Sequence, residues 1–431
     1  MKGRWLFVAV SVASLLPVLA FLLIIFWMGF WQGSPGDPVV YTLKHYRELF
    51  TDGSTYRTLL NTLGFATTTV LIALFFAVPM AWLVERTDLP GKNLIFALAT
   101  IGALVPTFFT SMGWVFLLHP RIGIINKLLM ELLGLAQAPF NIASLVGMGW
   151  VEGLGLSSIA FIMIVATYRS MDPALEEAAR VHGLGILRTL RYVTLPLTFP
   201  GIIAAAIYIF TIGLSAFEVP AIIGMSNKIF TFSTFIFYKI QPQEELPSYG
   251  MAGAVSSLLV VLALLLSWGY FRTLKVSHRY AVVTGKGYRP RLVELGRRGW
   301  ILAWLFLGGY FTVAKLLPFL LLVWASLLRY FQPPSWAALE QVSLRNFYAL
   351  PWNLLFQGAW NTVVLMLTVP TLTLILCLAI SWTVLRSGLK WRVSFDAVAF
   401  LPHAVPHLIL AIAAVFASLF LLRDVVSLYG S

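Results

Sequence analysis

The sequence predicts an all-α polytopic membrane protein, and three observations support this fold class. Hydrophobic residues make up 59% of the 431 residues, charged residues 11%, and the mean hydropathy is +0.87, whereas soluble proteins carry about 25% charged residues. Apolar runs follow one another between short polar breaks, and the basic residues concentrate in alternate breaks. Because a helix needs about 20 apolar residues to cross roughly 30 Å of hydrocarbon, we expect a bundle of membrane-spanning helices.

The apolar runs give nine candidate transmembrane helices. They cover residues 5–31, 58–84, 94–118, 147–168, 199–223, 249–271, 300–328, 357–385 and 394–422. The first run follows a basic start, Met1 to Arg4, as the apolar part of a signal peptide does. That run is too long for a signal peptide, so we expect an uncleaved first helix.

The basic residues favour one orientation of the bundle. If the N-terminus is cytoplasmic, the cytoplasmic segments hold 19 of the 30 Lys and Arg residues and the opposite segments hold 10, while Lys315 lies within a span. Because cytoplasmic loops carry an excess of Lys and Arg, the distribution predicts a cytoplasmic N-terminus. The membrane is expected to be a bacterial inner membrane. The distribution also explains most of the net charge of +13 without a nucleic-acid partner.

Sequence motifs of enzymes and metal sites do not stand out. The chain has no G-x-x-x-x-G-K-[ST] sequence, so we do not expect it to bind ATP through a P-loop. The pair His403 and His407 has the spacing of two metal ligands, but helix-end packing is the favoured interpretation because the repeat-related positions, Ala103 and Thr107, have no ligands. The lone Cys377 lies in an apolar run and predicts a buried thiol. We therefore predict neither a catalytic nor a metal site.

One structural unit is used twice along the chain. At an offset of 300 the aligned pairs are Asn61-Thr62 with Asn361-Thr362, Trp82 with Trp382, Arg86 with Arg386, Leu89 with Leu389, and Pro106 with Pro406. Shared Trp, Arg, Asn and Pro at one offset are not a consequence of apolar composition. Six helices separate the copies, so the two repeats are expected to be parallel, with a substrate path between them.

The repeat predicts the domain organisation. We expect a first helix and external segment at 1–57, a first transmembrane domain at 58–273 with a cytoplasmic loop at 170–197, a basic cytoplasmic linker at 274–299, a helix and external segment at 300–356, and a partial second transmembrane domain at 357–431. A full second copy would need about 140 more residues and three more spans. We therefore expect either truncation or completion by another chain.

The cytoplasmic loop between the fourth and fifth spans predicts a helix, a turn and a second helix. Pro173 suits a first helical turn, Glu176 is spaced to pair with Arg180, and Gly183 suits a helix end. Pro196 is expected to break the second helix before the next span. From propensity alone, such a segment is an amphipathic connector on the membrane surface.

The same loop resembles the EAA motif of binding-protein-dependent ABC importer permeases. The matching residues are Glu177, Ala178, Ala179, Gly183, Leu195 and Pro196. The resemblance implies a type I ABC importer transmembrane fold and a coupling helix that docks on a separate ATPase subunit, present in two copies, which binds ATP and Mg²⁺. It also implies an external substrate-binding protein and no cofactor in this chain.

Three stretches extend the resemblance to the fused two-repeat, ferric-iron-type permeases. They are Phe217-Glu218-Val219-Pro220 with Gly224, the central stretch from Tyr280 to Pro290, and the repeat itself. Ferric iron is accordingly the preferred substrate, with thiamine, aminoethylphosphonate and polyamines as alternatives. Glu218 and Pro220 are candidates for the translocation path, and a structural hydrogen bond is the competing role for Glu218. Glu152 is expected at the membrane interface.

Two other classes of membrane protein compete with the importer. A secondary transporter driven by an ion gradient can share parallel repeats, but it needs ionisable residues within the membrane. Here Glu218 and Lys315 are the main candidates. A membrane-embedded enzyme needs a convergent set of catalytic groups, which the sequence does not suggest. The importer is therefore the predicted class.

Overall fold

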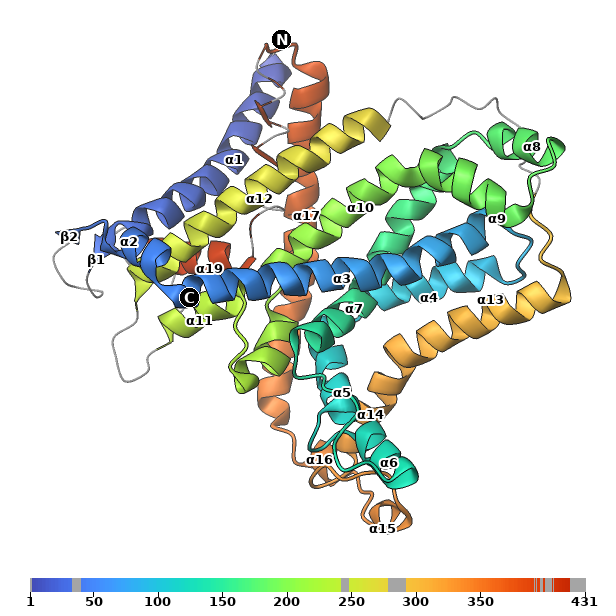
Figure 1. Cartoon of the computed structure of the whole chain (residues 1–431). Helices are drawn as coiled ribbons and strands as arrows, with labels where there is room; N and C mark the ends of the chain where they lie inside the picture. Colours follow the sequence, from blue (N-terminus) through green and yellow to red (C-terminus); the bar gives the residue numbers. More distant parts are fainter. Residues whose placement is uncertain are drawn as a thin grey trace. The chain divides into compact units, whose positions relative to one another are not determined.

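The computed structural model of the chain describes residues 2–32, 40–241, 248–277, 292–390, 392, 394, 395, 398, 399, 405 and 407–418. Its helices up to residue 194 are α1 Lys2–Gly29, α2 Lys44–Thr51, α3 Gly53–Arg86, α4 Lys92–Leu104, α5 Thr107–Leu118, α6 Ile124–Leu133, α7 Leu145–Ser170, α8 Ala174–Val181, α9 Ile186–Thr189 and the π-helix η1 Leu190–Thr194. After these come α10 Leu195–Ser215, the π-helix η2 Pro220–Gly224, the 3₁₀ helix η3 Met225–Asn227, α11 Phe232–Ile240, α12 Tyr249–Ser277, α13 Gly296–Phe311, the π-helix η5 Thr312–Leu316, α14 Leu317–Ser326, α15 Trp336–Leu339, α16 Arg345–Tyr348, α17 Trp352–Arg386 and α19 His407–Phe416. Two short strands, β1 Trp31–Gln32 and β2 Val40–Tyr41, pair antiparallel (Figure 1).

The predicted all-α membrane fold class is confirmed. Among the described residues, seven helices are long and apolar enough to cross a membrane, or eight if α4 and α5 count as one bent span. Of the ninth predicted span, 394–422, the structure describes residues 394, 395, 398, 399, 405 and 407–418, and α19 lies among them. The central stretch from Tyr280 to Pro290 also lies outside them.

The fifth span differs from the prediction. Its helix runs from Ile186 to Ser215, so it starts before the predicted residue 199 and ends before Glu218. Pro196 does not break this helix, because it lies in the first turn of α10, directly after the π-helical turn η1. Proline lacks an N–H to donate, and the wider turn ahead of it absorbs the altered hydrogen-bond pattern.

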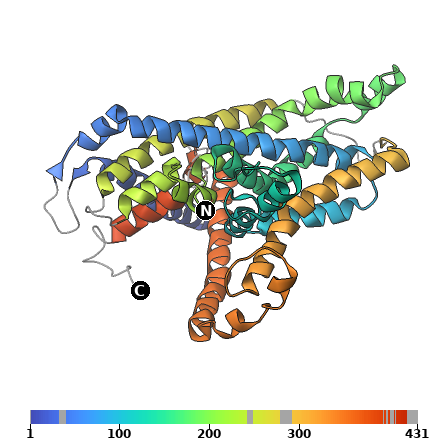
Figure 2. The same cartoon turned by 60° about the horizontal axis from the view of Figure 1, so that its bottom comes forward.

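The chain forms two compact units, and the one made of residues 53–235 and 265–323 contains the predicted coupling loop. Its core is built on α3 and α7, which lie side by side with α4 and α10 against them (Figure 2). Two glycines on α7 permit this close approach. A Cβ atom on Gly149 would lie 2.5 Å from Cβ of Thr68, and one on Gly153 would lie 2.6 Å from Cβ of Ile72.

The α3–α7 contact gives a first testable prediction. Gly149→Ala should destabilise the protein by about 1–3 kcal/mol, because the added methyl group forces two packed helices apart. Gly308→Ala in α13 is the matched control, since a Cβ there meets nothing within 4 Å and alanine favours a helix. Thermal unfolding in detergent micelles measures both variants. Equal melting temperatures would contradict the close-packing argument.

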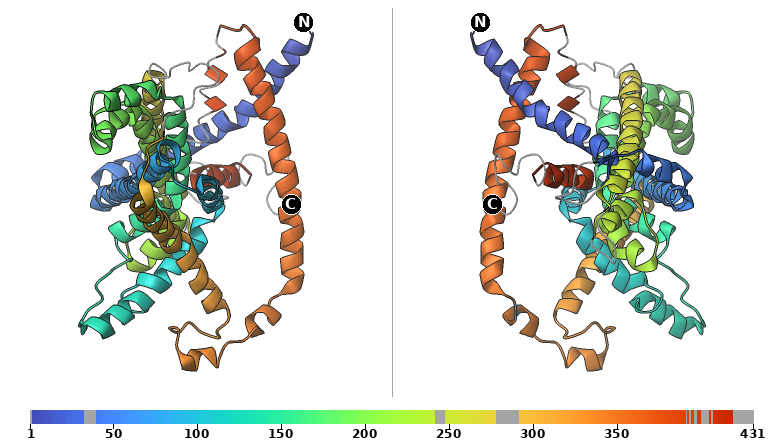
Figure 3. Two further views of the ribbon diagram at one scale, coloured as in Figure 1. Left: turned by 90° about the vertical axis from the view of Figure 1, so that its right-hand side faces the viewer. Right: turned by 90° about the vertical axis from the view of Figure 1, so that its left-hand side faces the viewer.

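The other unit consists of residues 1–52, 236–264 and 324–431. Within it α1 crosses α17, as the views in Figure 3 show, and the hydroxyls of Ser11 and Thr383 lie 2.9 Å apart at this crossing. Most of α17 is nevertheless exposed, and Cys377 is exposed with it. The predicted buried thiol is therefore wrong: an apolar run in a membrane helix does not require burial within the protein.

Candidate functional site

The predicted coupling loop forms a short helix and a tight turn at the end of the unit that contains α3, α7 and α10. The structure confirms the predicted helix, α8, with Pro173 just before it and Glu176 and Glu177 in its first turn. Acidic residues in a first turn are stabilised by the positive end of the helix dipole. The helix ends at Val181, and α9 begins at Ile186. Figure 1 shows α8 and α9 at the end of the unit where α10 begins.

Gly183 makes the turn between these two helices. Its φ angle is +83°, a left-handed conformation that costs residues with a Cβ roughly 1–2 kcal/mol. The N–H of Gly183 donates to the carbonyl oxygen of Arg180 at 2.9 Å, and the N–H of Leu184 donates to that of Ala179 at 3.1 Å. These bonds satisfy carbonyls at the end of α8, as in a glycine C-cap.

A buried ion pair fixes the base of α8. The carboxylate of Glu176 lies 2.7 Å from Nε of Arg86, at the end of α3, and each residue is only 5% exposed. The other oxygen of Glu176 accepts from the Thr194 hydroxyl at 2.5 Å. Arg86 also donates from Nη2 to the carbonyl oxygen of Tyr168 at 2.8 Å. The network joins α3, α7, α8 and η1.

This network corrects one prediction and adds two residues. Glu176 pairs with Arg86, and a pair with Arg180 is not among the ion pairs of the described residues. The pairing follows from burial, because a guanidinium inside the protein needs a carboxylate. Arg86 and Thr194 were not predicted as site residues. For Arg86 a signal existed in the sequence, namely its repetition as Arg386.

The predicted motif residues lie in two places, on α8 with its turn and in the first turn of α10. Glu177 and Ala179 are half-buried, whereas Ala178 and Gly183 are exposed. Large apolar side chains are exposed around them: Leu175, Val181, Ile186 and Leu187. Leu195 and Pro196 lie in the first turn of α10. The exposed apolar side chains of α8 and α9 are of the kind that another protein covers in a complex.

The segment just before α13 pairs with the end of α3, beside this loop. The N–H of Val293 donates to the carbonyl oxygen of Arg86 at 2.8 Å, and the N–H of Asp88 donates back to that of Val293 at 3.0 Å. A hollow of about 570 Å³ separates this segment from α8, and its polar lining comes from Glu177, Arg180 and Glu294. The segment and the coupling loop thus form one surface.

Asp88 fastens the same segment. Its carboxylate accepts from the backbone N–H of Leu295 at 2.9 Å and from Nε1 of Trp300 at 3.0 Å. These two bonds, the backbone one first, lower the pKa of Asp88. Since the pKa of Asp88 is depressed in the folded protein, its ionised carboxylate stabilises the fold at neutral pH. This stabilisation is lost as the pH falls through the folded-state pKa.

The second predicted set, Glu218 and Pro220, lies apart from the loop, past the end of α10. Pro220 is buried at the start of η2. Glu218 is exposed, and its Oε2 accepts from the N–H of Phe108 at 2.8 Å and from the hydroxyl of Thr107. Glu152, predicted at the interface, is buried in α7 at 4% exposure. Burial within the protein does not fix the depth of a residue in the membrane, so the interfacial position of Glu152 stays a prediction.

The histidine pair is only partly described, since His403 lies outside the described residues and His407 begins α19. Among the described residues no group of three or more His, Cys, Asp or Glu side chains is arranged to hold a metal ion. The site is therefore characterised by its helix-turn-helix surface and its buried ion pair.

Comparison with curated proteins finds permeases. No family model matches the chain. The putative ferric transport system permease protein FbpB 1 of Haemophilus influenzae is 23% identical over 408 residues, covering 88% of this chain and 61% of that protein. The galactooligosaccharides permease GanP of Bacillus subtilis is 25% identical over 57% of this chain and 60% of its own length. The molybdenum permease ModB of Haemophilus influenzae is 31% identical over 36% and 66%.

The chain spans about three fifths of the length of the first two of these relatives. Among solved structures, a bacterial ABC transporter involved in the import of the acidic polysaccharide alginate overlaps with a TM-score of 0.44 at 17% identity, over 63% of this chain and 94% of that chain.

Proposed function

This chain belongs to the family of ABC transporter permeases, and we propose that it is a membrane-spanning subunit of an ATP-driven importer fed by an external binding protein. The observation that carries the proposal is the E-A-A-x3-G loop, folded as a helix and a glycine turn and held at its base by the buried pair of Arg86 and Glu176. ATP hydrolysis belongs to a separate subunit, present in two copies.

The geometry supports a coupling role for α8. The exposed side chains of Ala178, Val181 and Leu187 offer an apolar docking face, and the half-buried Glu177 and Arg180 line the hollow beside it. Because Glu176 ties α8 to the end of α3, a displacement of the docked helix is transmitted to a membrane-spanning helix instead of being absorbed by a loose loop. Glu218 and Pro220 are assigned to the translocation path.

Ferric iron is the proposed substrate, on the strength of the ferric transport permeases among the relatives. Other relatives are named for sugars and molybdenum, so the substrate needs a direct test. The chain would be reconstituted in proteoliposomes with the ATPase subunit and the binding protein of the same transporter. ATP-dependent uptake of ferric iron, and not of thiamine, aminoethylphosphonate or a polyamine, is expected. Uptake that persists without ATP but follows an imposed ion gradient would refute the importer.

Topology gives an independent prediction. In a Cys377→Ser background, Glu177→Cys and Lys286→Cys should not react with an impermeant thiol reagent added to intact cells, because both positions are predicted to be cytoplasmic. Glu131→Cys in α6 is the control and should react, since residue 131 is exposed and lies between the third and fourth predicted spans. Labelling of residues 177 or 286 from outside would reverse the orientation and remove the coupling proposal.

A further inference from the structure

One predicted span, 94–118, is a pair of helices joined by a sharp bend. Helices α4 and α5 together satisfy the length and hydropathy of a single span but are bent by 94° at a short break. The 13 residues of α4 extend for about 20 Å at 1.5 Å per residue, less than the roughly 30 Å thickness of the hydrocarbon. The break at 105–106, with Pro106 before the first residue of α5, therefore lies within the depth of the membrane.

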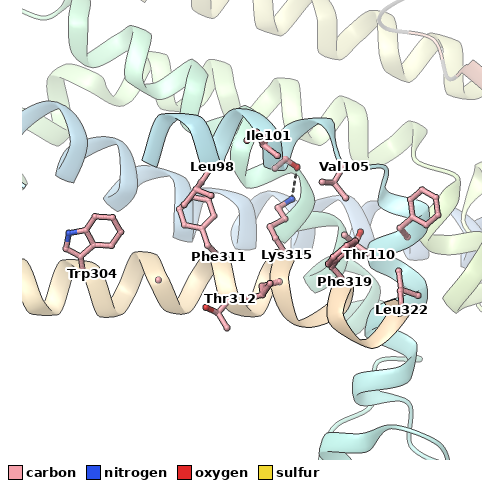
Figure 4. A pocket seen from close by; sticks show the side chains of 14 residues that line it. Leu98, Ile101, Val105, Thr110, Trp304, Phe311, Thr312, Lys315, Phe319 and Leu322 are labelled. Carbon is pink, nitrogen blue, oxygen red and sulfur yellow. Dashed lines mark hydrogen bonds between the residues drawn. The ribbon is translucent and has the colours of Figure 1, made fainter. Parts of the chain in front are cut away.

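Opposite charges meet the two helix ends at this break. The ammonium of Lys315 donates to the carbonyl oxygen of Gly102, near the end of α4, at 2.9 Å (Figure 4). Glu218 accepts from the N–H of Phe108 and the hydroxyl of Thr107, at the start of α5. A helix end leaves carbonyls or N–H groups unpaired, and its dipole favours a cation at the C-terminus and an anion at the N-terminus. Each charge thus has the sign that its helix end requires.

The two charges lie in different surroundings. Lys315 borders a cavity of about 490 Å³ between α4 and the span that contains it, and the cavity is lined mainly by apolar side chains such as Leu98, Val105 and Phe311. Phe108 is not part of that lining. The Glu218 side of the break is exposed instead, as are Leu104, Pro106 and Phe108.

Irregular backbone and an exposed carboxylate are not stable against lipid. At membrane depth, non-helical backbone occurs only where protein covers it or where it lines water. A charged side chain facing the hydrocarbon costs at least about 2.5 kcal/mol near the centre of the bilayer. Glu218 is exposed within its unit, so no other part of that unit shields its carboxylate, and water is a surrounding that would satisfy both conditions.

We propose that the Glu218 side of the break between α4 and α5 lines an aqueous substrate path, where the Glu218 carboxylate provides a fixed negative charge that favours a cationic substrate. The inference rests on the proposed importer function and specifies the charge of its cargo at this point. Lys315 acts from the opposite side by holding the end of α4. Glu218 thus has a positioning role at α5 and an electrostatic role in the path.

The test measures the reactivity of a thiol at the break in membranes that contain the assembled transporter. In a Cys377→Ser background, Phe108→Cys is treated with a cationic and an anionic methanethiosulfonate reagent. We expect the thiol to react with both reagents. The ratio of the cationic to the anionic reaction rate should be about tenfold higher than the same ratio for a free thiol, because a fixed charge concentrates counter-ions. Leu71→Cys in the unbroken helix α3, 63% exposed before substitution, is the lipid-facing control and should be far slower.

Two charge variants complete the test. Glu218→Gln keeps an oxygen that accepts from Phe108, so the break stays in place while the preference for the cationic reagent falls to near that of a free thiol. Lys315→Met should leave that preference unchanged or raise it. A thiol at 108 that does not react, or that reacts no faster than the thiol at 71, would show that protein or lipid covers this face. A charge preference that survives Glu218→Gln would equally overturn the proposal. Labelling needs no ATP, so these failures are distinct from a failure of ATPase coupling.

Discussion

Replacing Arg86 by methionine is expected to destabilise the protein by about 3–5 kcal/mol, the usual cost of leaving one partner of a buried ion pair alone. The variant would leave the Glu176 carboxylate, now 2.7 Å from the guanidinium, buried with the Thr194 hydroxyl as its remaining described partner. Glu176→Leu should cost a similar amount, since it leaves the guanidinium buried. Both effects are large relative to the stability of a typical domain.

Thermal or SDS-induced unfolding in micelles measures these losses, and a second ion pair supplies the control. Arg169 and Glu85 lie 2.9 Å apart, but the Arg169 side chain is 60% exposed, so Arg169→Met should cost only about 0–1 kcal/mol. The double variant Arg86→Met/Glu176→Leu should recover part of the single losses, because neither charge is then left unpaired. Single variants as stable as Arg169→Met would show that the pair does not hold α8.

Gly183→Val should abolish ATP-driven uptake and stimulation of the ATPase while the protein still inserts into the membrane. Valine is strained at the φ angle of +83° that Gly183 adopts, and the exposed turn leaves the membrane-embedded core unaffected. Glu177→Lys should have the same effect on transport, because it reverses a charge beside the docking face. Uptake and ATPase rate in proteoliposomes measure both variants.

Gly185 provides the matched control for this prediction. It lies two residues further along the same turn, its φ is −68°, and a Cβ there meets nothing within 4 Å. Gly185→Val should therefore keep uptake within about twofold, since its backbone conformation is open to any residue. If Gly183→Val and Glu177→Lys both transport normally, α8 is not the coupling helix.

The sequence was sufficient to predict the fold class and the secondary structure of the loop, because both depend on local signals. Hydropathy locates spans, and Pro173 and Gly183 delimit α8. The partner of Glu176 was wrongly predicted, because helical spacing considers only neighbours along the chain. Arg86 is distant in sequence, and only the packing of α3 against α7 and α8 brings its guanidinium to Glu176.

Burial and exposure inside the membrane were the least predictable properties. Cys377 was expected to be buried because of the hydropathy around it, yet it is exposed. Hydropathy reports that a segment enters lipid, and it does not distinguish the side facing lipid from the side facing another helix. The break at 105–106 had one signal in the sequence, namely Pro106, which marks a possible kink in an otherwise apolar run.

The pairing of Val293 with the segment from Arg86 to Asp88 has a consequence for assembly. Because this contact and the Asp88 bonds anchor the start of α13, the first span of the second repeat begins at a fixed point on the first repeat. The docking of α13 on the end of α3 is then an intramolecular event. Its rate is governed by effective concentration, not by encounter between separate subunits. In a chain built in this way, this interface forms at a rate that does not depend on how much of the protein the cell makes.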